Sequence, residues 1–400
     1  MQSLDLSIKK IKLTDINQLY HPTGIFGQDS KEIVYTKDTV SATKFPPILL
    51  KEWFYLVKKD GHLVIDYIPN KILDFQKLEE VMWWLWQGKY DIVYHGSANQ
   101  FNIKDLTNKI PKVPSGYSRF ICKKLVSTKI KGDDINKWTF GIITKGERGD
   151  WLEEIIASIK AQKIPNFEII ICGTYHDRAE KNFRYIPFFD RDDKGWITKK
   201  KNLIARVAKY ENICIVHDRI VFDKNWFAGM KKYGNCFDIL CNIQILKGQG
   251  ARVGDWLTYG GNRLNSPYGI SQLKYDDWDK YVYMGGQLSV VKRSVWEACP
   301  WNETLYWGEE DVELSFRFRD NGFLIRFNEY SKCMAMAWRF GNLPTKYYLS
   351  EGLLPKDMLM RRFLRFINKL IFAIPLFKKI TFPWITKLIH SKIYNIIIDR

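Results

Sequence analysis

The sequence predicts an α/β protein of two domains followed by a basic helical tail, and three observations lead to this prediction. Its 400 residues exceed the length of a typical single domain. Between residues 138 and 172 an apolar run, an amphipathic helical pattern and a second apolar run follow one another, which is the order of a parallel sheet with a covering helix. After residue 353, apolar residues alternate at helical spacing with arginine and lysine.

Composition narrows the class of protein. A hydrophobic share of 46% excludes wholesale disorder. The net charge of +18 predicts an anionic partner or surface, and nucleic acid, nucleotide-sugar phosphates and anionic lipid all satisfy it. The seven cysteines are scattered and form no C-x-x-C pair, so neither a zinc site nor a disulfide framework is indicated. Buried free thiols in a reducing compartment are expected instead.

Targeting segments are not evident in the sequence. Residues 1–13 alternate apolar and charged residues and lack the apolar core of a signal peptide. No stretch is apolar for long enough to span a bilayer. A cytoplasmic protein is therefore expected.

The first domain is expected over residues 1–130. Its predicted elements are helices at 47–57 and 75–85, a turn at 58–61, and strands at 31–35, 62–67, 90–94 and 118–123. The segment 46–67 resembles the later half of a Rossmann-like methyltransferase, in which a helix, a glycine turn and a strand follow in that order. No G-x-G-x-x-G loop precedes it to hold S-adenosylmethionine. The resemblance implies a truncated, degenerate domain with a structural or docking role, and an unrecognised binding site is the alternative.

A linker is predicted over 131–137, because residues 129–137 are polar and contain glycine without apolar periodicity. The second domain is expected over 138–345. It opens with a buried strand at 138–144, and a second strand is expected at 167–172.

The helix between these two strands has its own start signal. Asp150 is the expected N-cap and Glu153 its capping-box partner. The resulting strand, helix, strand order predicts parallel strands. Ligands of such sheets lie beyond the carboxyl ends of the strands, so the loops there are candidate binding loops.

Two later stretches place charged residues where loops meet regular elements. Lys201 and Asn202 are expected just before a helix at 203–210, where lysines meet phosphate both as charges and through nearby backbone amides. Their neighbours Lys199 and Lys200 are expected to belong to a solvated charge run. The predicted strand at 212–216 then ends in His217-Asp218-Arg219.

Residues 306–319 are the densest acidic stretch. Four carboxylates stand at the start of a helical apolar pattern: Glu309, Glu310, Asp311 and Glu313. A capped surface helix explains two of them, because the helix dipole favours negative charge there. Trp307 and Gly308 just before, and G-G-Q at 285–287, add apolar walls and a permissive backbone. This combination is typical of a site that positions a sugar and removes a proton from its hydroxyl.

The W-G-E-E-D sequence after G-G-Q resembles the C-terminal motif of GT-A-type inverting glycosyltransferases, of the family 2-like kind with a galactosyltransferase-like Trp-Gly-x-Glu-Asp motif. This resemblance implies a GT-A, Rossmann-like nucleotide-sugar-binding domain. It further implies that Asp311 is the catalytic base and that Glu310 binds the acceptor hydroxyl. The acceptor-binding residues that it implies are Gly286, Gln287, Trp307 and Gly308.

The resemblance also implies a donor site. In these enzymes the first strand ends in Thr-x-x-Glu, whose two residues face the base and ribose, and a later segment lies along the diphosphate. A third segment, Asp-x-Asp, holds a divalent metal. The matching positions are Thr144 and Glu147, Lys201 and Asn202, and Asp218 and Arg219. The sequence departs from the pattern after the second strand, where Gly173-Thr174 stands in place of an aspartate.

The sequence does not decide whether a divalent metal ion binds at the Asp-x-Asp position. Asp218 is the only acidic residue at the Asp-x-Asp position, and no histidine occurs at 333–338, where the family's metal-binding histidine is expected. Asp218 beside His217 can still hold Mn²⁺ or Mg²⁺, which prefer oxygen ligands. Alternatively, Arg219 neutralises the diphosphate directly.

The tail, residues 346–400, is predicted to be a basic amphipathic helical segment that lies in a membrane interface. Each lysine or arginine near an anionic leaflet contributes on the order of 1 kcal/mol. The alternative is a helix that packs on the protein's own core. The first interpretation predicts a cytoplasmic protein that is peripheral on the inner face of a membrane.

These motifs together predict an inverting hexosyltransferase of polysaccharide biosynthesis. It would move a sugar from a nucleotide-diphosphate donor, expected to be a UDP-sugar, to a hydroxyl of a glycan or lipid-linked acceptor, with no nucleic acid as partner. Two alternatives remain: an inactive glycosyltransferase-like scaffold, and a nucleic-acid-binding protein with its basic residues along one groove.

Overall fold

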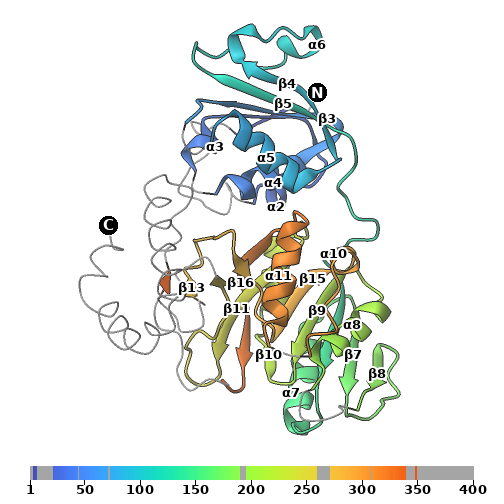
Figure 1. Ribbon diagram of the computed structural model, residues 1–400. Coiled ribbons are helices and arrows are strands. Elements are labelled where there is room, and N and C mark those ends of the chain that lie inside the picture. The colour runs from blue at the N-terminus through green and yellow to red at the C-terminus, as the bar shows by residue number, and fades with distance from the viewer. Residues whose placement is uncertain are drawn as a thin grey trace, which may run out of the picture.

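The computed structural model describes residues 3–6, 21–43, 45–70, 73–189, 195–258, 271–306, 308–338 and 347–348. Within these ranges the chain is a mixed α/β protein, as predicted (Figure 1). Its two larger sheets belong to an N-terminal unit, residues 3–124, and a C-terminal unit, residues 137–348. Trp307 and the predicted tail, apart from residues 347–348, lie outside the described residues.

The N-terminal unit is built on a sheet with the strand order β1-β2-β3-β5-β4. The first three strands are parallel, β5 is antiparallel to β3, and β4 is antiparallel to β5. The strands are β1 (Ser3–Asp5), β2 (Lys31–Lys37), β3 (Val57–Tyr67), β4 (Tyr90–Ser97) and β5 (Ser118–Lys124). The helices are α2 (Thr23–Phe26), α3 (Thr39–Ala42), α4 (Pro46–Leu56), α5 (Phe75–Trp86), the 3₁₀ helix η1 (Ala98–Gln100) and α6 (Lys104–Thr107).

The predicted strands and helices of this unit are confirmed within a few residues, but the predicted turn at 58–61 lies inside β3. Pairing with β2 passes from Lys31↔Val57 to Ile33↔His62, so the four residues form a bulge. A Cβ on Gly61 would lie 2.6 Å from the Glu32 carbonyl oxygen. Glycine is therefore needed for the bulge to lie against β2.

The C-terminal unit is built on a sheet with the strand order β10-β16-β11-β15-β9-β6-β7-β8 and a smaller sheet with the order β14-β12-β13-β17. The strands are β6 (Lys137–Ile143), β7 (Asn166–Gly173), β8 (Phe183–Pro187), β9 (Asn212–His217), β10 (Ile220–Phe222), β11 (Ile239–Leu246), β12 (Leu257–Thr258), β13 (Ser271–Leu273), β14 (Val282–Tyr283), β15 (Leu288–Lys292), β16 (Ile325–Ala335) and β17 (Tyr347–Tyr348). The helices are α7 (Gly149–Lys160), α8 (Ile197–Val207), α9 (Trp226–Tyr233), α10 (Arg293–Ala298) and α11 (Glu310–Asp320).

The parallel sheet predicted for this unit is confirmed. β6 pairs in parallel with β7 and with β9, and β7 pairs in parallel with β8. The carboxyl ends of β6, β7 and β9 therefore lie at one edge, which we call the carboxyl edge. Thr144, Gly173 and Asp218 stand there, at or just after the ends of these strands.

Gly173 is required by close packing at the carboxyl edge. Its φ is 142°, and a Cβ at this position would lie 1.9 Å from the Thr144 carbonyl oxygen. No side chain fits between the two strands at this point. The packing gives a physical reason why the chain has glycine at this position.

The predicted capping box of α7 is wrong. The helix begins at Gly149, its N-cap residue is Arg148, and no side chain caps it. Asp150 lies in the first turn instead. Glu153 points elsewhere, because its Oε1 accepts a hydrogen bond of 2.5 Å from the Tyr175 hydroxyl.

The start of α8 also differs from the prediction. The helix begins at Ile197 rather than at 203, so Lys201 and Asn202 lie in its middle. Tertiary contacts fix this earlier start, because Trp196 Nε1 donates to the Glu303 carbonyl and Thr198 Oγ1 donates to the Leu305 carbonyl. Lys200 is buried, so the prediction of a solvated charge is wrong for it.

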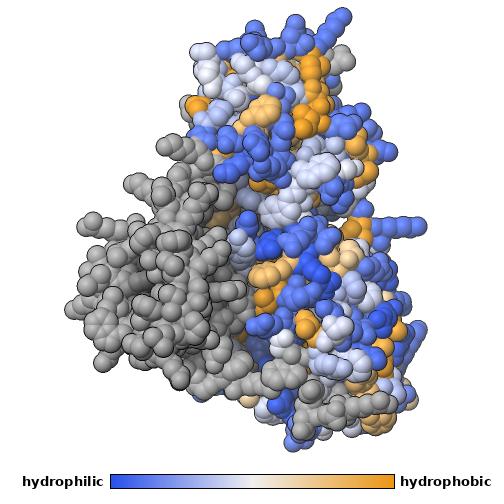
Figure 2. Space-filling model, in the orientation of Figure 1, coloured by the Kyte–Doolittle hydropathy of each residue, from blue (hydrophilic) through white to orange (hydrophobic). Residues whose placement is uncertain are grey.

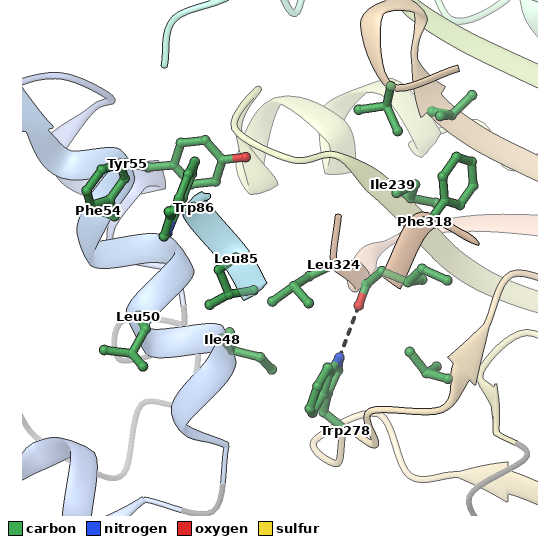
Figure 3. Close-up of a cluster of buried hydrophobic side chains, with 14 of the residues drawn as sticks. Ile48, Leu50, Phe54, Tyr55, Leu85, Trp86, Ile239, Trp278, Phe318 and Leu324 are labelled. Carbon is green, nitrogen blue, oxygen red and sulfur yellow. Dashed lines mark hydrogen bonds between the residues drawn. The ribbon is translucent and has the colours of Figure 1, made fainter. Parts of the chain in front are cut away.

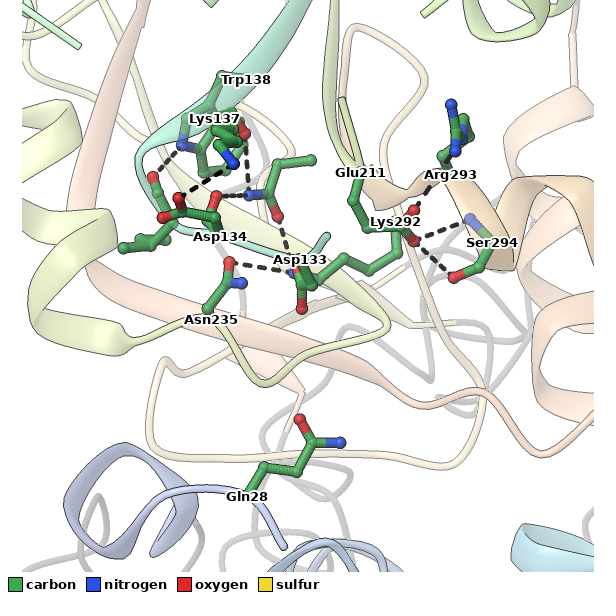
Figure 4. Close-up of polar contacts among 12 residues, drawn as sticks. Gln28, Asp133, Asp134, Lys137, Trp138, Glu211, Asn235, Lys292, Arg293 and Ser294 are labelled. Carbon is green, nitrogen blue, oxygen red and sulfur yellow. Dashed lines mark hydrogen bonds and ion pairs between the residues drawn. The ribbon is translucent and has the colours of Figure 1, made fainter. Parts of the chain in front are cut away.

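The predicted linker, 131–137, consists of turns and coil between β5 and β6 except for Lys137, which is the first residue of β6, and its second half is fixed to the C-terminal unit (Figure 4). The ammonium of Lys292, which is fully buried, lies 2.6 Å from Asp133 Oδ1. It also donates to the side-chain oxygens of Asn212 and Asn235. Buried charges are stable only when paired in this way, so the linker is anchored rather than loose.

Helix α4 lies between the two units, and every one of its residues is buried. One cluster of buried apolar side chains contains residues of both units, and Figure 3 shows side chains of α4 and α5 facing those of β11, α11 and the segment before β16. Polar contacts cross the same interface. The Tyr55 hydroxyl donates to Asp238 Oδ1 at 2.7 Å, and Trp84 Nε1 donates to the Arg319 carbonyl at 2.5 Å.

On the face shown in Figure 2, hydrophilic residues cover most of the described surface and apolar residues are scattered. Of the helices in the described ranges, none has the length and apolar composition that crossing a bilayer requires.

Candidate functional site

The acidic residues singled out in the sequence lie at the start of α11. Gly308 and Glu309 both have left-handed backbone conformations, with φ of 83° and 59°. This tight turn leads directly into the helix, whose first residues are Glu310 and Asp311. The turn aims these two side chains at the strand β15 and the loop before it, where Gly286 lies.

Asp311 accepts two backbone hydrogen bonds. Its Oδ2 receives the amide of Gly286 at 2.7 Å, and its Oδ1 receives the amide of Val312 at 2.9 Å. Burial and the neighbouring Glu310 raise the pKa of Asp311 to about 6, although Lys201 and the two amides act in the opposite direction. A carboxylate with this pKa is ionised at neutral pH and is a better proton acceptor than an ordinary aspartate.

Lys201 is the counter-charge of this carboxylate pair. Its ammonium is fully buried, donates to the Gly286 carbonyl at 2.8 Å and lies 3.7 Å from Glu310 Oε1. Burial lowers the pKa of Lys201, while Glu310 and Asp311 act to raise it. Lysine, two carboxylates and the backbone of Gly286 therefore form one compact group, which we call the acid cluster.

Gly286 holds the acid cluster together because it has no side chain. A Cβ there would lie 2.9 Å from Glu310 Oε1 and 3.2 Å from Asp311 Oδ2. Its amide binds one carboxylate and its carbonyl binds the ammonium. The backbone of Gly286 thus binds a negative charge through its amide and a positive charge through its carbonyl.

A second polar group surrounds Asp218 after β9. Asp218 Oδ2 accepts from the Thr144 hydroxyl at 2.9 Å, and Oδ1 lies 2.7 Å from Arg148 Nη1. The ammonium of Lys200 donates to the Thr144 carbonyl at 2.9 Å. We call Asp218, Thr144, Arg148 and Lys200 the cationic cluster, because its side chains carry two positive charges and one negative charge.

The two clusters lie at the same edge of the sheet. Strands β9 and β15 are antiparallel neighbours, with Val216 opposite Leu288. The pairing continues beyond the strands, since the amide of His217 donates to the Gln287 carbonyl at 3.0 Å. Asp218 therefore follows one strand next to the point where Gly286 and Gln287 precede the other.

The remaining residues named from the sequence have different surroundings. Glu147 is exposed beside the cationic cluster, and Arg219 is half-buried. Gln287 is buried, and its Nε2 donates to Gln244 Oε1 at 2.7 Å. Gly308 is exposed, and Trp307 lies outside the described residues.

Asn202 is occupied by contacts within the protein. Its Nδ2 donates to the carbonyl of Trp301 and to Glu303, and its Oδ1 accepts from Trp296 Nε1 and from the amide of Trp301. Its amide group therefore ties α8 to the segment that leads toward α11.

The residues around Asp218 fit a divalent cation poorly. One oxygen of its carboxylate is held by a guanidinium and the other by a hydroxyl. In the part of the chain that the structure describes, no group of three or more histidine, cysteine, aspartate or glutamate residues is arranged to hold a metal ion. Hard cations require several oxygen ligands, which this arrangement does not offer.

Sequence reasoning missed three components of the site. Arg148 was passed over because its partner Asp218 is 70 residues away. Lys200 was predicted to be exposed because runs of charged residues usually lie on the surface. Trp196 and Tyr306, whose rings lie 4.9 Å apart beside the turn into α11, form an aromatic pair that only the tertiary contacts of α8 reveal.

Three comparisons with known proteins were made for the whole chain. No family model and no curated protein matches the sequence. A solved structure, TarS of S. aureus, is similar over 50% of this chain and 37% of its own length, with a TM-score of 0.35 and 13% sequence identity. The chain thus spans little more than a third of that protein.

Proposed function

We propose that the chain is a GT-A-type inverting glycosyltransferase that moves a sugar from a nucleotide-diphosphate donor to a hydroxyl of a glycan or lipid-linked acceptor. The observation that carries the proposal is the position of Asp311, whose pKa is raised to about 6, at the same edge of the sheet as the cationic cluster. Transfer from a nucleoside diphosphate needs a base for the acceptor and positive charge for the leaving group. The placement of this carboxylate beside positive charge favours an active enzyme over an inactive scaffold.

In the proposed reaction Asp311 accepts the proton of the acceptor hydroxyl as the hydroxyl oxygen attacks the anomeric carbon of the donor sugar. The new carbon–oxygen bond forms on the face opposite the leaving group. The bond from the anomeric carbon to the β-phosphate oxygen breaks, and its electron pair leaves with the nucleoside diphosphate. A single displacement of this kind inverts the anomeric centre, and the base contributes about 100- to 10,000-fold.

The acceptor is proposed to lie between the turn into α11 and the aromatic pair. Glu310 is 3.7 Å from Lys201, which leaves its carboxylate free to accept a hydrogen bond from a sugar hydroxyl. Tyr306, which is exposed, offers a ring face for the apolar C–H side of a sugar, and Trp196, whose ring carries the Lys199 ammonium, supports Tyr306 from behind. Further acceptor contacts are proposed for Gly286, Gln287, Trp307 and Gly308.

The donor is proposed to lie along the carboxyl edge, with Thr144, Glu147, Asp218 and Arg219 around the nucleotide and its diphosphate. A uridine nucleotide is the proposed donor base. Lys201 and Asn202 take supporting roles in this proposal, because Lys201 is fully buried against the carboxylates and Asn202 is saturated by protein contacts. Lys201 sets the charge of the acid cluster, and Asn202 holds the helix that carries it.

The N-terminal unit is proposed to be a degenerate, methyltransferase-like domain with a structural role. Its α4 and β3 keep the order helix, glycine-containing bulge, strand. It also holds the far end of α11, since Lys51 Nζ donates to the Gly322 carbonyl at 2.8 Å. The tail remains the proposed membrane contact, which would make the protein peripheral on the inner face of a membrane.

Replacing Gly286 by alanine is expected to lower transfer about 100-fold with little loss of stability. The added methyl group would displace the Glu310 carboxylate, and a misplacement of about 1 Å at a reacting centre costs this much. The fold should tolerate it because the clash involves the far end of a flexible side chain. Steady-state transfer and thermal melting measure the two effects. Gly149→Ala, where an added Cβ meets nothing within 4 Å, is the control, and equal activities of the two variants would contradict the assigned geometry.

The proposed function is tested by supplying the intact protein with a panel of nucleotide sugars and measuring both donor hydrolysis and donor binding. Hydrolysis or binding of one donor in preference to the others is expected, and its identity names the sugar. Binding is the stricter readout, because an enzyme that needs its acceptor hydrolyses no donor alone. Failure to bind any nucleotide sugar or nucleoside diphosphate would overturn the proposal and leave an inactive scaffold.

A further inference from the structure

Arg148 is a charged residue that the motifs do not assign, and it is the member of the cationic cluster that pairs with Asp218. It is the last residue before α7 and therefore stands at the carboxyl edge, four residues after Thr144. Its Nη1 lies 2.7 Å from Asp218 Oδ1, and its guanidinium carbon lies 5.2 Å from the ring centroid of Trp151. Asp218 and Trp151 thus hold the guanidinium from two sides.

The exposure of the pair is uneven. The side chain of Arg148 is 39% exposed, whereas that of Asp218 is 12% exposed. A ligand arriving from solvent therefore meets the guanidinium before it meets the carboxylate. Arginine has five N–H donors, and the Asp218 contact uses one of them, so donors remain for phosphate oxygens.

The same contacts work against a metal ion at this position. A divalent cation bound by Asp218 would stand a few ångströms from a guanidinium, and like charges at that distance repel strongly in a partly buried site. The Thr144 hydroxyl donates its proton to the other carboxylate oxygen, so that oxygen is also engaged.

We propose that Arg148, and not a divalent cation, supplies the positive charge that binds the diphosphate of the donor and stabilises it as it leaves. This inference rests on the proposed function. Asp218 and Trp151 act as positioning residues that keep the guanidinium at the carboxyl edge before the donor arrives. Lys200, whose ammonium lies against the Thr144 carbonyl, adds positive charge to the same edge. A guanidinium can donate two parallel hydrogen bonds to two phosphate oxygens in addition to its charge, whereas a lysine ammonium cannot form this bidentate contact.

The test is binding of uridine, guanosine and thymidine diphosphates to the full chain by calorimetry, once with EDTA and once with manganese. Binding of one of them in EDTA with an affinity close to that in manganese is the expected result. Arg148→Met is expected to weaken that binding roughly 10- to 100-fold in EDTA, the range for losing hydrogen bonds to a charged group. Arg148→Lys should recover only part of it, because lysine keeps the charge and loses the fork.

Arg293→Met is the matched control. Arg293 is also ion-paired, lies 4.0 Å from Glu211 Oε2, and is 38% exposed (Figure 4). Its amide donates to the Glu211 carbonyl just before β9, so it stands at the opposite end of that strand from Asp218. The affinity of Arg293→Met for the nucleoside diphosphate should equal that of the unchanged protein. Thermal melting of each variant shows whether it is folded. Binding that appears only with manganese, or an Arg148→Met affinity equal to that of the control, would overturn the inference while the proposed function stands. Absence of binding by any nucleoside diphosphate in either condition would overturn the proposed function itself.

Discussion

Replacing Asp311 by asparagine is expected to lower the rate of sugar transfer by about 100- to 10,000-fold while nucleoside-diphosphate binding is retained. Asparagine has nearly the same shape but cannot accept the proton of the acceptor hydroxyl. The loss should therefore appear in kcat rather than in the affinity for the donor, which lies at the cationic cluster. Single-turnover transfer and calorimetry separate the two quantities.

The pH dependence of sugar transfer by the unchanged protein also tests whether Asp311 is the base. Because Asp311 must be ionised to act as a base and its pKa in the free protein is about 6, kcat/KM for the acceptor should rise with pH through that value and then level off. Lys201 acts to lower the pKa of Asp311. In Lys201→Met the midpoint of the rise should therefore move to higher pH, a shift that a merely structural lysine would not produce.

Glu313→Gln provides the control for Asp311→Asn. Glu313 belongs to the first turn of the same helix, but its Oε1 lies 2.6 Å from Arg317 on the surface of α11. Removal of this carboxylate should leave transfer nearly unchanged. If Asp311→Asn were as active as Glu313→Gln, or if kcat/KM for the acceptor showed no midpoint near pH 6, Asp311 would not be the base.

Local patterns of the sequence were sufficient to predict β2 to β5 with α4 and α5 in the N-terminal unit, and β6, α7, β7, β9 and α11 in the C-terminal unit, but not β8 or the strands β10 to β17. Apolar runs such as 138–144 and 212–216 are continuous because both faces of these strands are buried, and such runs are visible without knowledge of the fold. Part of the acid cluster could also be predicted from local sequence. Glu310 and Asp311 are adjacent in the chain, and the glycine that holds them occurs in a recognisable G-G-Q.

The contacts that complete the site were not predictable in this way, because they join distant parts of the chain. The Arg148–Asp218 pair depends on two parallel strands ending at one edge. The start of α8 at Ile197 depends on carbonyls more than 100 residues later in the chain. The burial of Glu52 in α4, which an exposed helix would leave in water, depends on the C-terminal unit packing against it. Each of these outcomes was decided by tertiary packing rather than by local propensity.

Breaking the ion pair between Glu52 and Arg326 is expected to destabilise the fold by about 3–5 kcal/mol. Arg326 Nη1 lies 2.5 Å from Glu52 Oε1, and both side chains are buried between the two units. The Thr23 hydroxyl donates to the other oxygen of Glu52 at 2.6 Å. Arg326→Met would leave Glu52 charged in a buried site without its arginine partner, and this poorly compensated charge is the source of the cost.

The pKa of Glu52 predicts how this stability depends on pH. Burial by itself would raise that pKa, but His21, Arg326 and the hydrogen bonds of Glu52 outweigh burial and lower it from 4.5 to about 2. A carboxyl group whose pKa is lower in the folded state stabilises the fold above its unfolded pKa, and this contribution is lost as the pH falls. Between about pH 4.5 and pH 2 the protein should therefore lose about 3 kcal/mol of unfolding free energy from this group.

Denaturant unfolding of Arg326→Met, Glu52→Gln and the double variant measures the pair directly. The double variant should be more stable than the sum of the single losses indicates, because removing both partners leaves no unpaired charge. Lys123→Met removes an exposed pair with Asp60 and should cost no more than about 1 kcal/mol. Since buried apolar side chains of both units form one cluster, the two units should unfold in a single transition. If Arg326→Met unfolded in two transitions, with the later one unchanged from the original protein, the Glu52–Arg326 pair would join two units that are each stable alone. The N-terminal unit would then contribute nothing to the stability of α11.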